Sequence, residues 1–483
     1  MNIPIALFVL GIGIGQVPLA GVSPLPEGDP SLAPGGEMNR VPGAAVTPVP
    51  GADTRHVPPD TVPIRFSLEE AVGRALEENP SLRAQRATAE ARAQLPLKAS
   101  QAFLPSVSLG LQGMRTTDPV AVFGLKLRQE SFAQNDLALD ALNRPDPYSG
   151  YNATASVQLP LLAPEGLYGF AQARKAARAE EAGAERAAEA TRFFTVQAYW
   201  DARLASRNVA ALDTALMAVR AHVRQAEAMR EEGLATSLDA RLAELRASEI
   251  EVQRLAANAQ AKNALSGLRA LLALPDSQEI VLTDDLTDPL SPSPCAEATE
   301  CSFQNRSDLR AHDLGVEAME DGVKKAWASQ LPSLAAFGAV GHYAKDAPFD
   351  DGSGDWTIGI GLSWNPVKGL SGLGDVRAAR AEEDAAQARR EAAYRQAEVE
   401  ALKASRMLEA AKERARVAAR AAEESRTALE QARLRYRTGA APITELLDVQ
   451  AAATRATLSE LAARRDLFVA HAALDLAYGV NDR

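Results

Sequence analysis

The stretch LPSVSLGLQ at residues 104–112 changes the hydrophobic period of the chain from that of a helix to that of a strand. From Ser106 onward, apolar residues alternate with Ser, Gly and Gln, which is typical of a β-strand with one apolar and one polar face. Residues 151–159 and 356–364 alternate in the same way, and Leu331-Pro332-Ser333 repeats the start of the first strand. The sequence therefore predicts four strands in two pairs.

Two long stretches that follow the strand pairs are predicted to be helical. Residues 167–232 contain no proline, and beyond Gly169 in the first turn only Gly183 is an interior breaker; residues 375–438 contain neither glycine nor proline. At ~1.5 Å per residue, each stretch would be a helix about 100 Å long. A helix of that length has no compact core of its own to lie on and requires other helices beside it.

Shorter helical patterns complete each half. One begins at Phe66, where Ser67 and Glu70 form a capping-box pattern, and continues past a break at Asn79-Pro80 to about residue 102. Another covers residues 237–274, after the first long helix.

The two halves of the chain are related by a tandem duplication. Leu104 and Leu331 are 227 positions apart, and so are Lys98 and Lys325. Gly233 and Gly439, which each end a long helix, are 206 positions apart, as are Leu268 and Leu474. We expect a first repeat over residues 66–290, an inter-repeat segment over 291–304 and a second repeat over 305–483.

The N-terminal region is expected to lie outside both repeats. Residues 1–20 are almost entirely apolar and end in Pro-Leu-Ala, which favours a secretory signal peptide, with a short membrane anchor as the alternative. Residues 21–65 are rich in proline and glycine and are interpreted as an arm or linker.

Composition excludes several classes of function. The net charge of -11 argues against a nucleic-acid partner, because no basic stripe is available to neutralise phosphates. The five histidines are scattered, and the chain carries no nucleophile elbow, phosphate loop or CxxC motif. We therefore predict that the protein is not an enzyme and binds no cofactor or metal.

The chain has two cysteines, Cys295 and Cys301. In an exported protein such a close pair favours a structural disulfide. A metal site would need more ligands nearby, and His312 alone does not complete one.

The predicted strands could either span a membrane or form a soluble sheet. Apart from the N-terminus, no apolar run reaches the ~18 residues of a membrane helix, but strands of about ten residues with one apolar face suit a membrane barrel. Four strands cannot close such a barrel, so several chains would have to contribute. The alternative is a soluble periplasmic coiled-coil scaffold in which the strands form a small, half-buried sheet.

The order and spacing of these motifs resemble the outer-membrane efflux protein family, the TolC-like outer membrane factors. The resemblance covers residues 66–480 and rests on the Phe66 to Asn79-Pro80 opening, the paired Leu-Pro-Ser strand starts and the turns at Gly233 and Gly439. It implies a mainly α homotrimer with a 12-stranded β-barrel in outer-membrane lipid, continued by a long periplasmic α-helical tunnel. The segment between the halves would form an equatorial belt.

The resemblance also implies a function and partners. The trimer would be a passive export duct of a tripartite efflux or type I secretion system, and it would dock to a periplasmic adaptor (membrane fusion) protein and an inner-membrane pump. The helix-turn tips at Gly233-Leu234 and Gly439-Ala440 would form the docking end.

In the family, certain residues close the periplasmic entrance. By position, Glu445 and Asp448 would form acidic rings at the gate, and Asp239 would bond to Tyr436 as a latch. At Ala441 the chain departs from relatives that have an arginine completing this network. The alternative interpretation is that Asp239 and Glu445 are first-turn acids that stabilise helix dipoles by ~0.3–1 kcal/mol each.

Overall fold

The computed structural model describes residues 62–233, 235–287, 306–366 and 370–480. The predicted signal peptide, most of the arm, Leu234, Cys295, Cys301 and the 291–304 segment lie outside the described residues, so the predictions for them stay predictions. None of the helices among the described residues combines the length and hydrophobicity that a membrane crossing needs.

The described residues are mainly helical, with one four-stranded sheet, as the sequence predicts. The first part of the chain contains β1 (Ile64–Phe66), α1 (Leu68–Glu78), α2 (Pro80–Ala93), α3 (Leu95–Ala99), η1 (Ser100–Ala102), β2 (Ser106–Thr116), α4 (Pro119–Arg128), η2 (Gln134–Leu137), α5 (Leu139–Asn143), β3 (Tyr148–Leu162), α6 (Pro164–Glu231), α7 (Ser237–Leu271) and β4 (Ile280–Leu282). The second part contains α8 (Ser307–Ala328), β5 (Ser333–Ala344), β6 (Gly352–Ser363), α9 (Ser371–Arg437) and α10 (Ile443–Tyr478). Helix, two strands, long helix and helix thus occur twice.

Local sequence explains how the first helices begin and end. The Ser67 hydroxyl accepts from the Glu70 amide at 3.2 Å, and the Glu70 carboxylate accepts from the Ser67 amide at 2.7 Å, so the predicted capping box is present. Asn79 ends α1, and its side-chain oxygen accepts from the amides of Ser81 and Leu82. The Asn79-Pro80 step therefore ends one helix and starts another.

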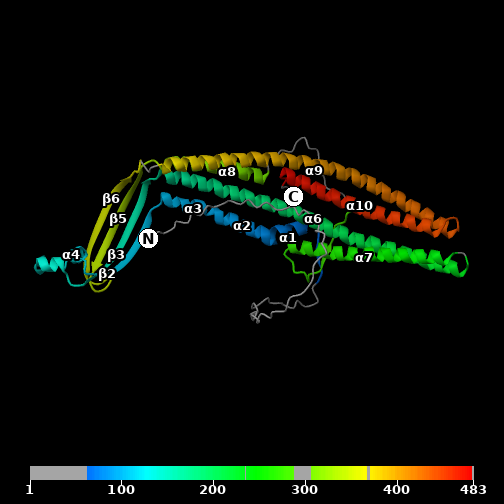
Figure 1. Cartoon of the computed structure of the whole chain (residues 1–483), viewed down its shortest axis with the longest axis horizontal. Helices are drawn as coiled ribbons and strands as arrows, with labels where there is room; N and C mark the ends of the chain where they lie inside the picture. Colours follow the sequence, from blue (N-terminus) through cyan, green and yellow to red (C-terminus); the bar gives the residue numbers. More distant parts are fainter. Residues whose placement is uncertain (1–61, 234, 288–305, 367–369, 481–483) are drawn as a thin grey trace, which may run out of the picture. The chain divides into compact units, whose positions relative to one another are not determined.

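The four long strands form one antiparallel sheet in the order β2-β3-β5-β6. The two predicted pairs meet through β3 and β5, where Ala155 lies opposite Val340. Figure 1 shows the strands side by side, joined to the ends of α6 and α9. A second sheet, the parallel pair β1-β4, joins residues more than 200 positions apart and was not predicted.

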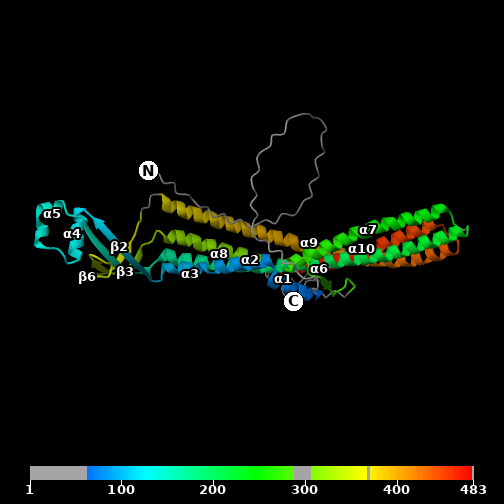
Figure 2. The same cartoon turned by 90° about the horizontal axis from the view of Figure 1, so that it is seen from below.

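The helices pack along their lengths, with α6 against α7 and α8, and α9 against α10 and α8. Both turns, between α6 and α7 and between α9 and α10, lie at the same end of these helices (Figures 1 and 2). One apolar cluster near that end combines residues of all four, among them Val223, Ala243, Tyr436 and Leu446. We call this end the helical tip.

Candidate functional site

The two turns of the helical tip share one backbone geometry. Gly233 and Gly439 have φ angles of 76° and 71°, a left-handed conformation that glycine adopts without steric cost. Beyond each glycine, an amide reaches back to the last turn of the helix. Ala235, three residues after the Glu232 cap, donates to the Met229 carbonyl at 3.2 Å, and Ala440, two residues after the Thr438 cap, donates to the Arg435 carbonyl at 2.8 Å. The turn after α9, in which Gly439 also donates to the Tyr436 carbonyl at 3.1 Å, has both hydrogen bonds of a Schellman motif.

The acid of the first turn is used by its own helix. Thr236 precedes α7, and its amide and hydroxyl each donate to the Asp239 carboxylate at 2.8 Å. The Asp239 amide in turn donates to the Thr236 hydroxyl at 3.3 Å. Asp239 is thus part of a capping box at the start of α7.

The acid of the second turn is used differently. Pro442 stands where the first turn has Thr236, and proline has neither a hydroxyl nor an amide hydrogen with which to build a capping box. Glu445 instead forms an ion pair with Arg435, across the turn on α9. Two acids at the same helix position therefore have different partners because one residue before the helix differs.

Asp448 is the most open of the tip acids. Its side chain is 81% exposed, and its closest cationic partner is Arg246 of α7, with an N–O distance of 3.8 Å. At that exposure the pair contributes little to stability, and Arg246 is only a loose partner for the Asp448 charge.

Tyr436 lies inside the helical tip with 4% of its surface exposed, and its hydroxyl has no hydrogen-bond partner among the described residues. Burial, and secondarily the negative charge of Asp239, raise the pKa of the Tyr436 hydroxyl above its usual value. Within one chain, the structure brings Asp239 close enough to act on Tyr436 electrostatically, with no hydrogen bond between them. Ala441, next to the second turn, is buried.

A histidine that sequence analysis did not single out also lies in this cluster. His222 of α6 is buried, and within the described part of the chain its Nε2 has no hydrogen-bond partner. Burial and the positive charge of Arg433 lower the pKa of His222, against a hydrogen bond with Gln450 that raises it. His222 is therefore neutral in the folded chain at neutral pH.

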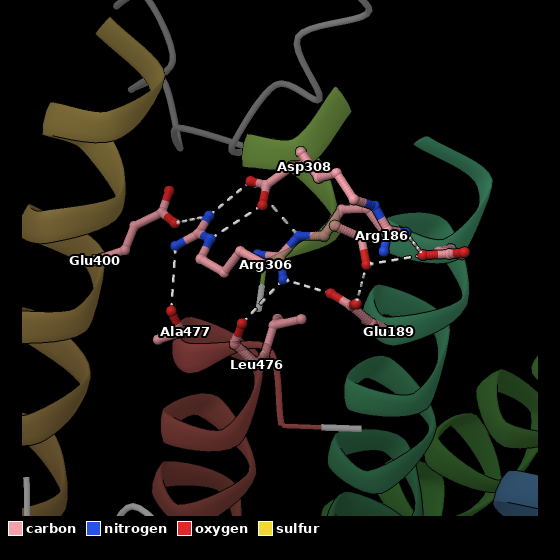
Figure 3. A network of polar contacts seen from close by, with 10 residues as sticks. Arg186, Glu189, Arg306, Asp308, Glu400, Leu476 and Ala477 are labelled. Carbon is pink, nitrogen blue, oxygen red and sulfur yellow. Dashed lines mark hydrogen bonds and ion pairs between the residues drawn. The ribbon is translucent and has the colours of Figure 1, made fainter. Parts of the chain in front are cut away.

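A second polar group joins four helices far from the tip (Figure 3). Arg306, before α8 and 3% exposed, donates to Asp308, to Glu400 of α9 at 2.9 Å and to the Ala477 carbonyl at 3.3 Å. Arg186 of α6 donates to Glu189 at 2.8 Å and to the Leu476 carbonyl at 2.9 Å. We call these residues the arginine joint.

The arginine joint places two cations on the C-terminal carbonyls of α10, where the helix dipole is negative. Burial opposes the charge on Asp308, but the Arg306 hydrogen bonds and the charge of Arg186 outweigh it and hold the pKa of Asp308 below its usual range. The joint is thus a charged contact that ties the end of α10 to α6, α8 and α9.

The four-stranded sheet has two unlike faces. The pairing places Val107, Val157, Gly338 and Ile358 in one row, and Leu109, Ala155, Val340 and Trp356 in the next. The opposite face carries Ser108, Ser156, Ala339 and Thr357 in one row and Gly110, Thr154, Gly341 and Asp355 in another. We call these the apolar face and the polar face.

The residues that the structure describes leave the apolar face uncovered in the single chain. Leu109 is 82% exposed and Ile358 is 75% exposed, and Val107, Leu111, Ile360 and Leu362 are exposed as well. Contiguous exposed apolar surface of this kind marks an interaction site in a folded protein. In the described part of the chain, no group of three or more His, Asp and Glu side chains could hold a metal ion.

The chain is similar to one protein family and to several solved structures. Residues 301–480 match the family described as outer membrane efflux protein. The chain shares its fold with VceC from Vibrio cholerae (TM-score 0.70, 18% identity, covering 85% of this chain and 96% of that one). CmeC from Campylobacter jejuni has the same fold, with a TM-score of 0.69 and 18% identity, covering 85% of this chain and 85% of CmeC. MtrE from Neisseria gonorrhoeae has it too, with a TM-score of 0.70 and 18% identity, covering 85% of this chain and 88% of MtrE. No curated protein sequence matches the chain.

The family resemblance drawn from the sequence is thereby confirmed. The family model that matches residues 301–480 describes outer-membrane efflux proteins, which is the class of protein that the sequence predicts.

Proposed function

We propose that this outer-membrane efflux channel works as a homotrimer that forms one 12-stranded barrel and one periplasmic helical tunnel. It acts as a passive duct, and a periplasmic adaptor protein and an inner-membrane pump load cargo at the helical tip. The observation that carries the proposal is the apolar face of a sheet whose two outer strands, among the described residues, each pair with a strand on one side only.

The size of the apolar face supports a place in lipid. Trp356 on β6 and Trp364, the residue directly after β6, are eight residues apart, or about 26 Å along a strand and about 20 Å of height at a ~40° tilt. Exposed Ile358, Ile360 and Leu362 lie between them. Membrane barrels carry an apolar band ~25 Å tall bordered by aromatic residues, which is close to this span.

The open edges support the trimer. Among the described residues, β2 and β6 each pair with one strand only. Unpaired backbone amides and carbonyls each cost several kcal/mol in lipid, so both edges require strands of neighbouring copies. Three copies of four strands give the 12 strands that the family resemblance implies.

A surface of α7 supports contact between copies along the tunnel. Leu238, Leu245 and Val252 recur every seven residues and are all exposed in the single chain. A heptad stripe of apolar side chains is the seam by which one helix packs against another. A neighbouring copy would cover this stripe.

The tip acids support a charged entrance. In a trimer, three copies of Asp448 and three of Glu445 would surround one axis, with Asp239 and Tyr436 behind them as the latch. The turns at Gly233-Leu234 and Gly439-Ala440 would meet the adaptor. We also propose that residues 1–20 are a signal peptide and that Cys295 and Cys301 form a disulfide.

Extraction of outer membranes followed by native mass measurement in detergent tests the proposal. We expect a complex of three chains in the outer-membrane fraction, each with a mass of 51.3 kDa less that of the removed signal peptide. A monomer that is stable in bilayers, or a protein released without detergent, would contradict the barrel and favour the soluble scaffold.

A further inference from the structure

The segment between β2 and β3 is longer than a hairpin needs. Thr116 and Tyr148 are paired neighbours, so a two-residue turn could join the strands, yet residues 117–147 form α4, η2 and α5 instead. Figure 1 shows α4 at the end of the strands that lies farthest from α6 and α9, and Figure 2 shows α5 beside it. We call residues 117–147 the insert.

The insert is fixed to the polar face of the sheet. Arg128 of α4 stacks on the Tyr343 ring at 5.0 Å and donates to its hydroxyl at 3.3 Å. Gln129 accepts from the Tyr148 hydroxyl at 2.8 Å and donates to the Ala344 carbonyl at 3.0 Å. Tyr148 and Tyr343 both belong to the polar face, because they stand in register with Thr116 and Asn152.

Packing supports the same placement. Leu125 is buried and lies directly over Gly150, where a Cβ would come within 2.9 Å of a Leu125 methyl group. Gly150 stands two residues from Tyr148 on β3, so it faces the same side. The Ser353 hydroxyl of β6 also bonds to the Arg128 carbonyl. Three strands thus hold α4 against one face.

We propose that the insert is a flap that covers the outer mouth of the channel lumen. The proposal rests on the proposed function, in which the apolar face meets lipid and the polar face lines the lumen. Because α4 is bound to the polar face at the end away from the helices, each copy places its flap on the lumen side of the mouth.

The dimensions make the flap effective. Twelve strands ~4.8 Å apart at a ~40° tilt give a circumference of about 75 Å and a diameter of about 24 Å. Three helices ~10 Å across, packed around one axis, need a circle of about 22 Å. Three flaps would therefore nearly fill the mouth, and cargo would pass only when they move aside.

Cysteine labelling in intact cells tests the flap. Ser156 lies in the middle of the polar face, deeper than the flap, and Leu109 lies on the apolar face. Each is changed to cysteine in a Cys295→Ser, Cys301→Ser background and exposed from outside to a small methanethiosulfonate and to a 5-kDa polyethylene glycol maleimide. The flap is then altered in two ways: Arg128→Ala with Gln129→Ala, or an Asn-Gly turn in place of residues 117–147.

With an intact flap, Ser156→Cys should react with the small reagent and only slowly with the large one. Both flap changes should speed the reaction with the large reagent at least tenfold. Arg144→Ala, which removes the same charge from an exposed position of the insert, should leave the rate unchanged. Equal rates with and without the flap would overturn the proposal.

A separate result identifies failure of the proposed function. If Leu109→Cys reacts with the water-soluble reagents as fast as Ser156→Cys does, or if Ser156→Cys reacts with neither reagent after the flap is removed, the polar face is not a lumen wall. The proposed barrel and the flap would then both be wrong.

Discussion

Arg306 donates to the carbonyl oxygen of Ala477, and the first repeat contains the same contact in another chemical form. Asn79, 227 positions before Arg306, donates to the Leu271 carbonyl at 3.0 Å, and Leu271 is 206 positions before Ala477. These are the two offsets at which the sequence itself repeats. In both repeats, the residue that precedes a helix leading to the strands (α2 or α8) donates to a carbonyl at the C-terminal end of the last helix of that repeat (α7 or α10).

The arginine joint should be a major stabilising contact of the second repeat. Arg306→Ala removes the partner of two carboxylates and of a helix-end carbonyl, which should lower the free energy of unfolding by about 2–3 kcal/mol. Chemical denaturation of the purified protein measures the change. Arg395→Ala breaks only an exposed pair with Glu391 and should cost no more than about 0.5 kcal/mol. Equal effects of the two substitutions would show that the joint carries no special stability.

At the ends of α7 and α10, exchanging alanine and glycine should change the stability of the protein in opposite directions. Gly479 ends α10 with φ 68°, and Ala273, 206 positions earlier, has φ 52° after α7. Because a Cβ is strained in this conformation, Ala273→Gly should stabilise the protein and Gly479→Ala should destabilise it, each by about 1 kcal/mol. Shifts of the thermal midpoint in opposite directions would confirm this, and shifts in the same direction would contradict it.

The tip acids should contribute unequally to ion selectivity. Arg435 neutralises Glu445, whereas Asp448 is exposed and only loosely paired. Asp448→Asn should therefore reduce the cation selectivity of the resting channel more than Glu445→Gln does, because charge of one sign in a narrow pore attracts counter-ions. Reversal potentials in planar bilayers under a salt gradient measure this. If neither substitution changes the selectivity, these acids only stabilise their helix.

Arg435 supplies the control for that experiment. Arg435→Gln leaves Glu445 without its cation, so it should increase cation selectivity. The same substitution combined with Glu445→Gln should return the channel close to its original behaviour. An unchanged reversal potential in Arg435→Gln would place this pair away from the conduction path.

His222 should make the stability of the helical tip depend on pH. Its pKa is lowered in the folded protein, whereas in the unfolded chain it lies near 6.5. Below about pH 6.5 the unfolded chain therefore binds a proton that the folded state does not, and stability is lost as the pH falls. The thermal midpoint should drop less between pH 7.5 and pH 5.5 in His222→Gln than in the unchanged protein. His312→Gln, on α8, controls for the loss of a histidine, and identical drops in all three proteins would exclude His222 as the cause.

Much of the tip could be predicted from the sequence, because a glycine after a long helix indicates where that helix turns. The partners of the tip acids could not. Asp239 and Glu445 occupy equivalent positions, and Asp239 caps its helix whereas Glu445 reaches another one. The Thr236 and Pro442 difference was a usable signal, since only threonine can complete a capping box. The arginine joint had a signal too, in the 227-residue offset from Asn79 to Arg306.

The sequence by itself determined the helices, the four long strands and their duplication, because these follow from periods of 3.6 and 2 residues and from breakers such as Pro80 and Gly439. Only the tertiary structure decided which distant groups meet: β1 beside β4, Arg306 on the end of α10, and α4 on the polar face of the sheet. Hydrophobic period is a local property, and it records which side of an element is apolar. A hydrogen bond or an ion pair between distant residues depends on how whole elements are packed, which no local pattern encodes.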